Sequence, residues 1–580
     1  MKTSLDDRTV QAVLVVVAVG LLARFVFLGS RISHYDEARV AWWGLEYLRT
    51  GATEYRYIIH GPFLQLVHRP LFAAFGATDF VARAPVALIT GLFPLVALWF
   101  RRYLSDLEVV GVALFLALNP IVLYYSRFMR SSMLVAGFCF VAFAAIVRWL
   151  DGRGTAYLYA ASAALAFGFA AKENAIVYVL CWIGAAALLL DTAFFRPRTH
   201  DSGGDLLTTQ LGAWRETYAP EDPAGRQRLL GYGSHLLAAV TLFALLTFFF
   251  FAPRGGEAGL WTGNLSMTLD ATLTDISEGL DYWFGQGGET TFGTYGERLG
   301  LFVRTTLTYA GPLFVLSAVG FVIERYARSN SRPLVLACAY WGFASVIGYP
   351  LGTDIWGAWI IVNALVPLSV PAAVGLGFLL DIGRESLADN DTVSVAAVAV
   401  LLLLVVGQVA VVGGGAVYGN PTSPDNDLVQ FAQPQQEMRT AVDATAATAA
   451  ANTDGPDALF YGGEDFVTMD ETATRTPACI NWFRTLPWAW YLDANDVSVT
   501  CANSSETMPD QLPPVVVTQA DCTLDRAVAC RDDPEALSPP EEIAQRVPDR
   551  YERHAYLHRT TGGSYFNGVV VYVDSERGTS

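Results

Sequence analysis

Residues 10–28 read VQAVLVVVAVGLLARFVFL, an almost unbroken apolar run. A helix of roughly 20 apolar residues crosses a hydrocarbon core about 30 Å thick, so this run is predicted to span a membrane. It is too long for the apolar part of a secretory signal, and Gly29, Ser30 and Arg31 after it lack a small-x-small cleavage pattern. We therefore expect a first transmembrane helix that the mature protein keeps.

Apolar runs of similar length recur along the chain. They lie at 78–100, 107–125, 131–150, 156–171, 174–192, 231–252, 301–323, 333–350, 358–380 and 393–416. Of the 580 residues, 53% are hydrophobic and only 16% are charged. The sequence therefore predicts a mainly α fold, in which residues 1–416 form a polytopic bundle of about eleven transmembrane helices in the lipid bilayer of the cell membrane.

Arginine in the loops predicts the orientation, because cytoplasmic loops carry an excess of basic residues. If the N-terminus is cytoplasmic, every inner loop contains arginine: Arg101 and Arg102, Arg148 and Arg153, several between 193 and 230, Arg325, Arg328 and Arg332, and Arg384. The two long outer loops are then 29–77 and 253–300, and everything after 417 is also outside. Within the first loop, 36–49 has the pattern of an amphipathic surface helix.

The polar segment 417–580 is predicted to be a separate extracytoplasmic domain. A polar helix candidate at 427–451 precedes short β-type runs at 458–461, 497–500, 515–518 and 569–573, which indicates a small α/β domain. Four cysteines fall here, Cys479, Cys501, Cys522 and Cys530, and allow up to two disulfides in three possible pairings. The other three, Cys139, Cys181 and Cys338, lie in apolar runs and are expected to be core residues.

The charge balance excludes some partners. The net charge is −17, and only Lys2 and Lys172 among the 38 basic residues are lysines. Acidic excess with little lysine resembles proteins of salt-loving archaea. Nucleic acid is not an expected partner, because no basic face is available to neutralise phosphates. No phosphate-binding Gly-x-x-x-x-Gly-Lys-Ser/Thr loop is present either, so a nucleotide site is not expected.

An acidic pair, Asp36 and Glu37, follows the first span by eight residues. Adjacent side chains on a helix point about 100° apart, so one carboxylate can face a cavity while the other meets a structural partner. A carboxylate there can deprotonate an acceptor hydroxyl. The alternative is an interfacial helix N-terminus, where acidic residues interact favourably with the helix dipole.

Basic residues at predicted outer span ends form a second candidate group. Lys172 and Glu173 lie in a very short connection between two apolar runs, and Arg127 and Arg130 lie where the positive-inside rule disfavours arginine. Guanidinium and ammonium groups suit a phosphate, whereas the alternatives are a solvated turn and snorkelling arginines. His60, before Gly61 and Pro62, adds a titratable imidazole to this group. The alternative is a loop histidine that is only solvated.

The loop 253–300 is rich in aromatic residues, namely Trp261, Tyr282, Trp283, Phe284, Phe292 and Tyr295. These suit an interfacial belt or a sugar-stacking surface, and the belt is the preferred interpretation.

Taken in order, these residues resemble a known pattern. Asp36-Glu37, His60-Gly61-Pro62, the Ser-Arg-Phe-Met-Arg segment at 126–130 and Lys172-Glu173 follow one another as in GT-C glycosyltransferases. The likeness is to the branch with protein O-mannosyltransferases and the aminoarabinose transferase of lipid A. More narrowly, His-Gly-Pro-Phe at 60–63, the segment 352–367 and Leu-Pro-Trp-Ala-Trp-Tyr-Leu at 486–492 resemble the archaeal flippase activity-associated subfamily.

The resemblance implies a membrane glycosyltransferase with a sugar on a polyprenyl (dolichyl) phosphate as donor and an extracytoplasmic glycan, protein or lipid as acceptor. Asp36 then takes the role of base and Glu37 supports it. Lys172, Arg127 and Arg130 become candidates for the lipid phosphate, with Glu173 and His60 in the same donor site. No cofactor is implied, and a divalent metal at the acidic pair is left open.

One departure leaves a second interpretation. Many relatives carry an acidic residue or histidine soon after the Ser-Arg segment, where this chain has Ser131 and Ser132. The alternative is a non-enzymatic flippase-associated protein that binds or translocates lipid-linked sugars in the same cationic cavity.

Overall fold

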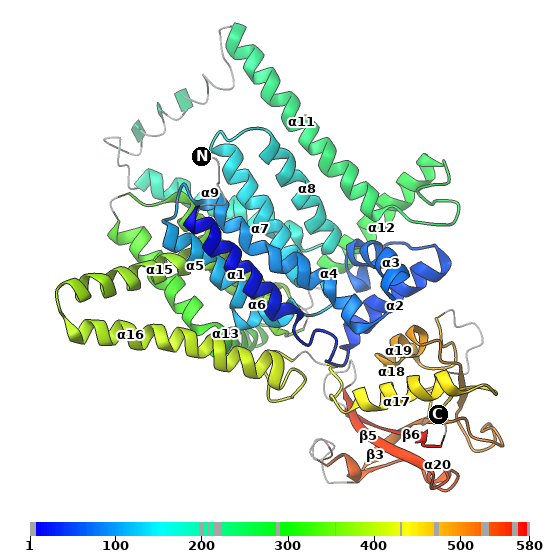
Figure 1. Ribbon diagram of the computed structural model, residues 1–580. Helices are drawn as coiled ribbons and strands as arrows, with labels where there is room; N and C mark the ends of the chain where they lie inside the picture. The colour runs from blue at the N-terminus through cyan, green and yellow to red at the C-terminus, as the bar shows by residue number, and fades with distance from the viewer. Residues whose placement is uncertain are drawn as a thin grey trace. The chain divides into compact units, whose positions relative to one another are not determined.

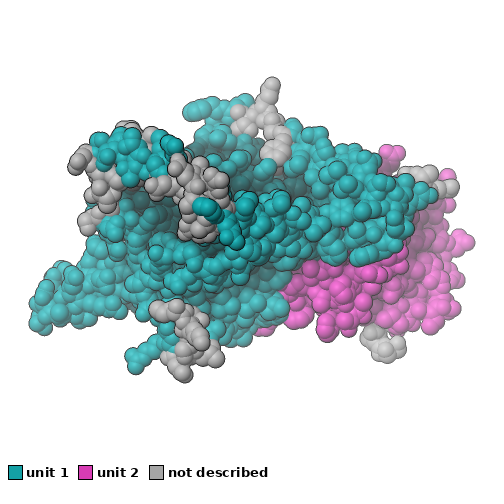
Figure 2. Space-filling view, turned by 90° about the horizontal axis from the view of Figure 1, so that it is seen from above, with its two compact units in different colours: residues 1–26, 52–63, 86–417 teal, residues 27–51, 64–85, 418–580 magenta. Residues whose placement is uncertain are grey.

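The computed structural model of the chain describes residues 7–195, 223–285, 291–328, 330–353, 355–429, 432–468, 475–523, 530, 533–559 and 566–576, with scattered positions between 202 and 215 (Figure 1). The chain divides into two compact units, which Figure 2 colours separately. Unit 1 comprises residues 1–26, 52–63 and 86–417, and unit 2 comprises residues 27–51, 64–85 and 418–580.

Unit 1 is a bundle of helices. They are α1 (Arg8–Phe25), the end of α4 (Asp79–Leu92) with η2 (Phe93–Phe100), α5 (Asp106–Leu118), α6 (Pro120–Tyr125), α7 (Ser131–Leu150), α8 (Ala156–Ala171), α9 (Ala175–Phe195), α11 (Pro223–Phe251), α12 (Leu265–Gly285), α13 (Phe292–Val322), α14 (Pro333–Gly352), α15 (Val362–Ala388) and α16 (Thr392–Gly407). Short 3-10 and π turns, η1 (Tyr57–Ile59), η3 (Ile323–Ala327), η4 (Ala358–Ile361), η5 (Gln408–Val412) and η6 (Gly415–Gly419), join or extend them.

Burial distinguishes central from peripheral helices. The apolar window of α15 with η4 is 94% buried, against 11% for α11 and 6% for α16. Helix α15 packs on α5, α13 and α14, so it forms the core, whereas the exposed apolar faces of α11 and α16 suit contact with lipid. In the described part of the chain, 8 helices are long and apolar enough to cross a membrane, and α8 and 175–190 are shorter apolar helices.

The predicted helical membrane fold is confirmed, since each of the predicted apolar runs lies on helix. The run 107–125 is interrupted where α5 ends and α6 begins. Asn119 caps α6 through hydrogen bonds from the amides of Ile121 and Val122, at 3.1 and 3.3 Å, and Pro120 has no N–H to continue the α5 hydrogen-bond ladder.

Unit 2 combines loop helices with the tail. It holds α2 (Tyr35–Thr50), most of α3 (Phe63–Phe75), the start of α4, and the tail elements α17 (Met438–Ala451), α18 (Trp482–Thr485), α19 (Trp488–Ala494) and α20 (Glu541–Ala544) with η8 (Pro534–Ala536). Since this unit also contains 27–51 and 64–85, it is larger than the predicted tail domain. The domain limits 1–416 and 417–580 stay a prediction.

The tail is the predicted small α/β domain. Its strands are β1 (Ala458–Tyr461), β2 (Val499–Ala502), β3 (Val515–Cys522), β4 (Leu537–Ser538), β5 (Tyr551–Arg559) and β6 (Phe566–Asp574). The sheet order is β2-β1-β3-β6-β5, with β1 parallel to β2 and β3 and the other pairs antiparallel, and α17 packs on the sheet (Figure 1). The helix predicted at 427–451 begins only at Met438, and strand β5 was not predicted. Cys479 pairs with Cys501 and Cys522 with Cys530, one of the three pairings left open.

Candidate functional site

The acidic pair lies in the first turn of α2, in unit 2. His34 is the N-cap: its Nδ1 accepts a hydrogen bond from the Asp36 amide at 3.0 Å, and Glu37 Oε2 accepts one from the His34 amide at 3.1 Å. This reciprocal capping satisfies amides that have no partner within the helix. The local sequence therefore starts the helix at Tyr35 and fixes where both carboxylates leave the backbone.

Glu37 is locked between two arginines. Its side chain is 2% exposed, and its oxygens lie 2.7 Å from a terminal nitrogen of Arg31 and 3.0 Å from Nε of Arg83. Burial would raise the pKa of Glu37, but the two guanidinium charges outweigh it and hold the pKa well below its usual range. Arg83 also donates to the carbonyls of Leu28 and Arg31, at 3.0 and 2.8 Å. Glu37 is thus a charged structural anchor.

Asp36 has a different environment. Its Oδ1 accepts a hydrogen bond from Arg39 at 2.7 Å, and its Oδ2 lies 3.9 Å from Nδ1 of His34. The Asp36 side chain is 12% exposed, and Arg39 follows it by one helical turn. The two adjacent carboxylates therefore meet different partners, and Asp36 is the more exposed of the two.

A second group of predicted residues comes together in unit 1, where Glu173 lies between α8 and α9. Glu173 Oε1 accepts a hydrogen bond from the Tyr55 hydroxyl at 2.5 Å, and its Oε2 lies 3.3 Å from Nδ1 of His60. The side chain is 7% exposed. This carboxylate joins the 52–63 segment to the short connection that also contains the half-buried Lys172.

The His-Gly-Pro turn at 60–62 has a defined geometry. His60 adopts φ +66°, which an L-residue rarely does, and a Cβ on Gly61 would lie 2.1 Å from the carbonyl oxygen of Ala170 in α8. Glycine is therefore required where the turn crosses the end of α8, close to Lys172. The imidazole of His60 stacks on Trp283 of α12, with ring centroids 4.8 Å apart.

The electrostatics of His60 follow from this packing. Burial, together with the positive charge of Lys172, lowers the pKa of His60 to about 4, although the Glu173 carboxylate acts in the opposite direction. The imidazole is consequently neutral at neutral pH. Arg130 also lowers the pKa of His60, and its guanidinium lies 5.9 Å from the Trp359 ring. Lys172, Glu173 and Arg130 thus all act electrostatically on His60, and we call these four residues the Lys172 cluster.

Arg127 binds elsewhere in unit 1. One of its terminal nitrogens donates to the carbonyls of Ala23, Arg24 and Val26, at 3.0, 2.7 and 2.7 Å. These carbonyls lie at the C-terminal end of α1, where the helix dipole makes a cation favourable. Arg127 is therefore engaged at the C-terminal end of α1.

The sequence did not single out Tyr55, Arg31 or Arg83 for these sites. Trp283 was noted only within the aromatic loop, and its contact with His60 was not predicted. The described residues contain no group of three or more His, Cys, Asp or Glu side chains arranged to hold a metal ion. Asp36 and Glu37 instead pair with arginines.

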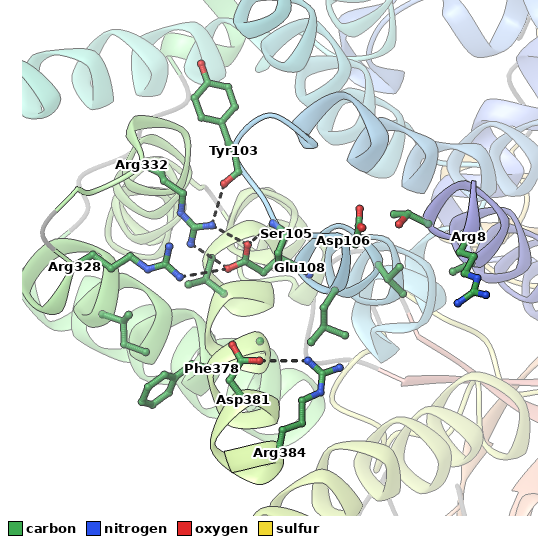
Figure 3. Close-up of a pocket in the computed structure, with 17 residues that line it drawn as sticks. Arg8, Tyr103, Ser105, Asp106, Glu108, Arg328, Arg332, Phe378, Asp381 and Arg384 are labelled. Carbon is green, nitrogen blue, oxygen red and sulfur yellow. Dashed lines mark hydrogen bonds and ion pairs between the residues drawn. The ribbon is translucent and has the colours of Figure 1, made fainter. Parts of the chain in front are cut away.

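Figure 3 shows a cavity of about 810 Å³ in unit 1 that contains none of the predicted site residues. It lies among the starts of α1 and α5, the 323–332 segment and the end of α15. Arg332 lies 2.7 Å from Glu108 and 2.8 Å from Glu324, and Arg384 lies 3.4 Å from Asp381. The acidic and basic side chains around this cavity largely neutralise one another, so the cavity has no preference for an anionic or a cationic ligand.

Comparison with known proteins agrees with this architecture. Residues 438–574 match the family model of the Agl23 flippase-associated protein C-terminal domain. No curated protein matches the sequence. The crystal structure of ArnT from Cupriavidus metallidurans bound to undecaprenyl phosphate is similar with a TM-score of 0.52 and 16% identity, over 96% of this chain and 97% of that chain. The apo ArnT structure gives 0.50 and 17%, over 99% and 100%. At such low identity the likeness shows the fold, which is the ArnT-like GT-C fold.

Proposed function

We propose that the protein is a membrane glycosyltransferase that transfers a sugar from a polyprenyl (dolichyl) phosphate to an extracytoplasmic acceptor, in the assembly of surface glycans or glycoproteins. The observation that carries the proposal is the division of the acidic pair. Glu37 is held by Arg31 and Arg83, whereas Asp36 keeps some exposure and a partner one turn away. A fold like that of ArnT, crystallised with undecaprenyl phosphate, supports a lipid-phosphate donor.

In the proposed reaction the acceptor hydroxyl attacks the anomeric carbon of the donor sugar and Asp36 takes the hydroxyl proton. A carbon–oxygen bond forms to the acceptor, and the bond from the anomeric carbon to the phosphate oxygen breaks. The polyprenyl phosphate leaves with the electron pair. We assign Lys172 and Arg130 to the phosphate, whose growing negative charge they stabilise. Glu173 holds the neutral imidazole of His60 beside them.

The proposal also places the chain in the membrane. The N-terminus is cytoplasmic and the 417–580 domain is outside, because arginine occurs in every predicted inner loop. A reporter fused after Tyr418 should be detected outside and one fused at Ala213 inside. Detection of both reporters on the same side would show that the predicted number of spans between the two fusion points is wrong by an odd number.

A second candidate is a non-enzymatic flippase-associated protein for lipid-linked sugars. Ser131-Ser132, where many relatives carry an acid or histidine, favours it, and the match of 438–574 to the Agl23 flippase-associated domain is compatible with it. Such a protein would need the cationic cluster but no base. Membership of the archaeal flippase activity-associated subfamily is compatible with both candidates.

Asp36→Asn distinguishes the two. As an enzyme the variant should bind polyprenyl phosphate but lose transfer, whereas a binding protein should be little affected. Asp381→Asn is the matched control, because Asp381 also pairs with an arginine three residues along its helix, at 3.4 Å. Transfer by Asp36→Asn at the wild-type rate would overturn the proposed base. In a deletion strain, loss of one surface sugar with accumulation of its charged lipid would support the transferase.

A further inference from the structure

Asp79 is a buried carboxylate at the start of α4 that no predicted role uses. Its side chain is 3% exposed and accepts four hydrogen bonds. Ser33 Oγ donates at 2.8 Å from the first outer loop, whereas the other three donors come from the tail: Arg439 at 2.7 Å, the Tyr491 hydroxyl at 2.8 Å and Trp490 Nε1 at 3.2 Å. All five residues belong to unit 2. One carboxylate thus ties the loop to the tail.

The same hydrogen-bond network reaches the acidic pair. The Tyr491 hydroxyl accepts the Ser33 amide at 2.8 Å, and Ser33 Oγ accepts from Arg83 at 3.3 Å. Arg83 in turn donates to Glu37 at 3.0 Å. Ser33 directly precedes the N-cap of α2, so Tyr491 binds the backbone from which the helix with Asp36 begins.

Further tail residues hold both ends of that helix. Gln436 Oε1 accepts the Ile32 amide at 3.2 Å, just before α2. Asp493 accepts from Trp42 at 2.5 Å and from Arg49 at 3.2 Å, in the middle and at the end of α2. Helix α19, which contains Tyr491 and Asp493, packs on α2. An independently folded tail would not need these bonds to the first outer loop.

We propose that the tail is a built-in part of the acidic-pair site, with Asp79 and Tyr491 as positioning residues that fix the start of α2 and thereby aim the Asp36 carboxylate. This inference rests on the proposed transferase function for its kinetic consequence. A general base must lie within hydrogen-bond reach of the proton it takes, and a misplacement of about 1 Å can cost on the order of 100-fold in rate. The buried Asp79 network supplies the required rigidity, because Asp79 accepts four hydrogen bonds and Tyr491 and Ser33 each take part in more than one.

Tyr491→Phe is the most selective test, since it removes one hydroxyl and keeps the buried ring. Loss of a hydrogen bond to a charged group predicts a fall in kcat of about tenfold or more, with the KM for the lipid-linked donor unchanged. Asp79→Asn should act in the same direction, and the double variant should lose less than the product of the two single losses. Tyr461→Phe is the matched control, because Tyr461 is a buried tail tyrosine that also bonds a carboxylate, Glu542, but within the sheet region.

Hydrogen exchange supplies a readout that does not need transfer activity. Tyr491→Phe should speed amide exchange over residues 33–39, whereas Tyr461→Phe should leave that segment unchanged. Unchanged exchange at 33–39 together with wild-type kcat in Tyr491→Phe would overturn the positioning role. Both tyrosine variants could instead give less folded protein with a normal kcat per folded molecule. That result would show that the network only stabilises the fold, and it would also overturn the positioning role. If the wild type shows no transfer but exchange rises only in Tyr491→Phe, the proposed function fails and the positioning of α2 stands.

Discussion

Glu37→Gln should unfold unit 2 at a clearly lower temperature, although the substitution hardly changes the shape of the side chain. The amide removes the one carboxylate that lies between Arg31 and Arg83, whose side chains are 7% and 1% exposed. Breaking a buried ion pair by removing the charge of one partner costs about 3–5 kcal/mol, because the remaining charge stays buried without compensation. Since a native domain is stable by only about 5–15 kcal/mol, this is a large share of the total.

Asp36→Asn should behave in the opposite way. Its pair with Arg39 is a single i,i+3 contact at 2.7 Å with side chains 12% and 14% exposed, against two arginines and 2% exposure for Glu37, so its loss should cost less, on the order of 1 kcal/mol. For a domain of 150–250 residues each kcal/mol lowers Tm by roughly 2–4 °C. We therefore expect a shift on the order of 10 °C for Glu37→Gln and only a few degrees for Asp36→Asn.

The assay combines thermal unfolding of the purified protein, followed by tryptophan fluorescence, with sugar transfer normalised to folded protein. Glu37→Gln should lose far more stability than Asp36→Asn, whereas Asp36→Asn should stay folded but lose transfer. Because the pKa of Glu37 is lowered, its stabilising charge is present above the usual carboxyl pKa and is lost as the pH falls below it. A large Tm loss in Asp36→Asn with none in Glu37→Gln would refute the assignment of the two roles.

Three further predictions concern the other unit and the tail. Lys172→Arg should lower transfer even though the charge is kept, because the guanidinium is larger and planar, and full activity in both Lys172→Arg and Lys172→Ala would remove Lys172 from the phosphate site. The pKa of His60 is lowered from 6.5 to about 4, so its contribution to stability is present above pH 6.5 and is lost as the pH falls toward 4. His60→Gln should therefore make Tm less dependent on pH between 6.5 and 4. An unchanged slope of Tm against pH would contradict this prediction. Mass spectrometry without reduction should recover peptides linked through Cys479–Cys501 and Cys522–Cys530, and Cys479→Ser should destabilise the tail by roughly 2–5 kcal/mol, whereas four free thiols would exclude both links.

The membrane fold could be predicted from the sequence because each span is a local signal. A run of apolar residues has to be helical in lipid, where no water satisfies the backbone, whatever its neighbours are. The tail was harder, because strands depend on partners. Strand β5 reads YERHAYLHR, which has only a weak apolar alternation, and it exists because Tyr551 to Arg559 pair in register with β6. A single segment does not contain that information.

The acidic pair could be located from the sequence, but its roles could not be assigned. Helical geometry predicts that adjacent carboxylates face different ways, and the structure agrees. Which one is locked depends on Arg83, which is 46 residues from Glu37 in the sequence. The contact between His60 and Trp283 is more distant still, and a lone histidine in a loop gives no signal for it. The roles of these site residues therefore depend on ion pairs and ring contacts between residues far apart in the sequence, which local spacing does not predict.

The contacts that arginines make in this chain give a physical reason for the rarity of lysine. Arg127 binds three carbonyls at the end of α1 with a single nitrogen, and Arg24 binds the carbonyls of Gly20, Leu116 and Ala117. A guanidinium with five donors satisfies helix ends efficiently. Position 172 also follows a helix end, since its amide donates to the Gly168 carbonyl at 2.9 Å. An arginine there would bring its forked donors to the C-terminal end of α8, as Arg127 does at the end of α1. A compact ammonium with three donors places its charge differently from a planar guanidinium, which makes Lys172→Arg an informative substitution.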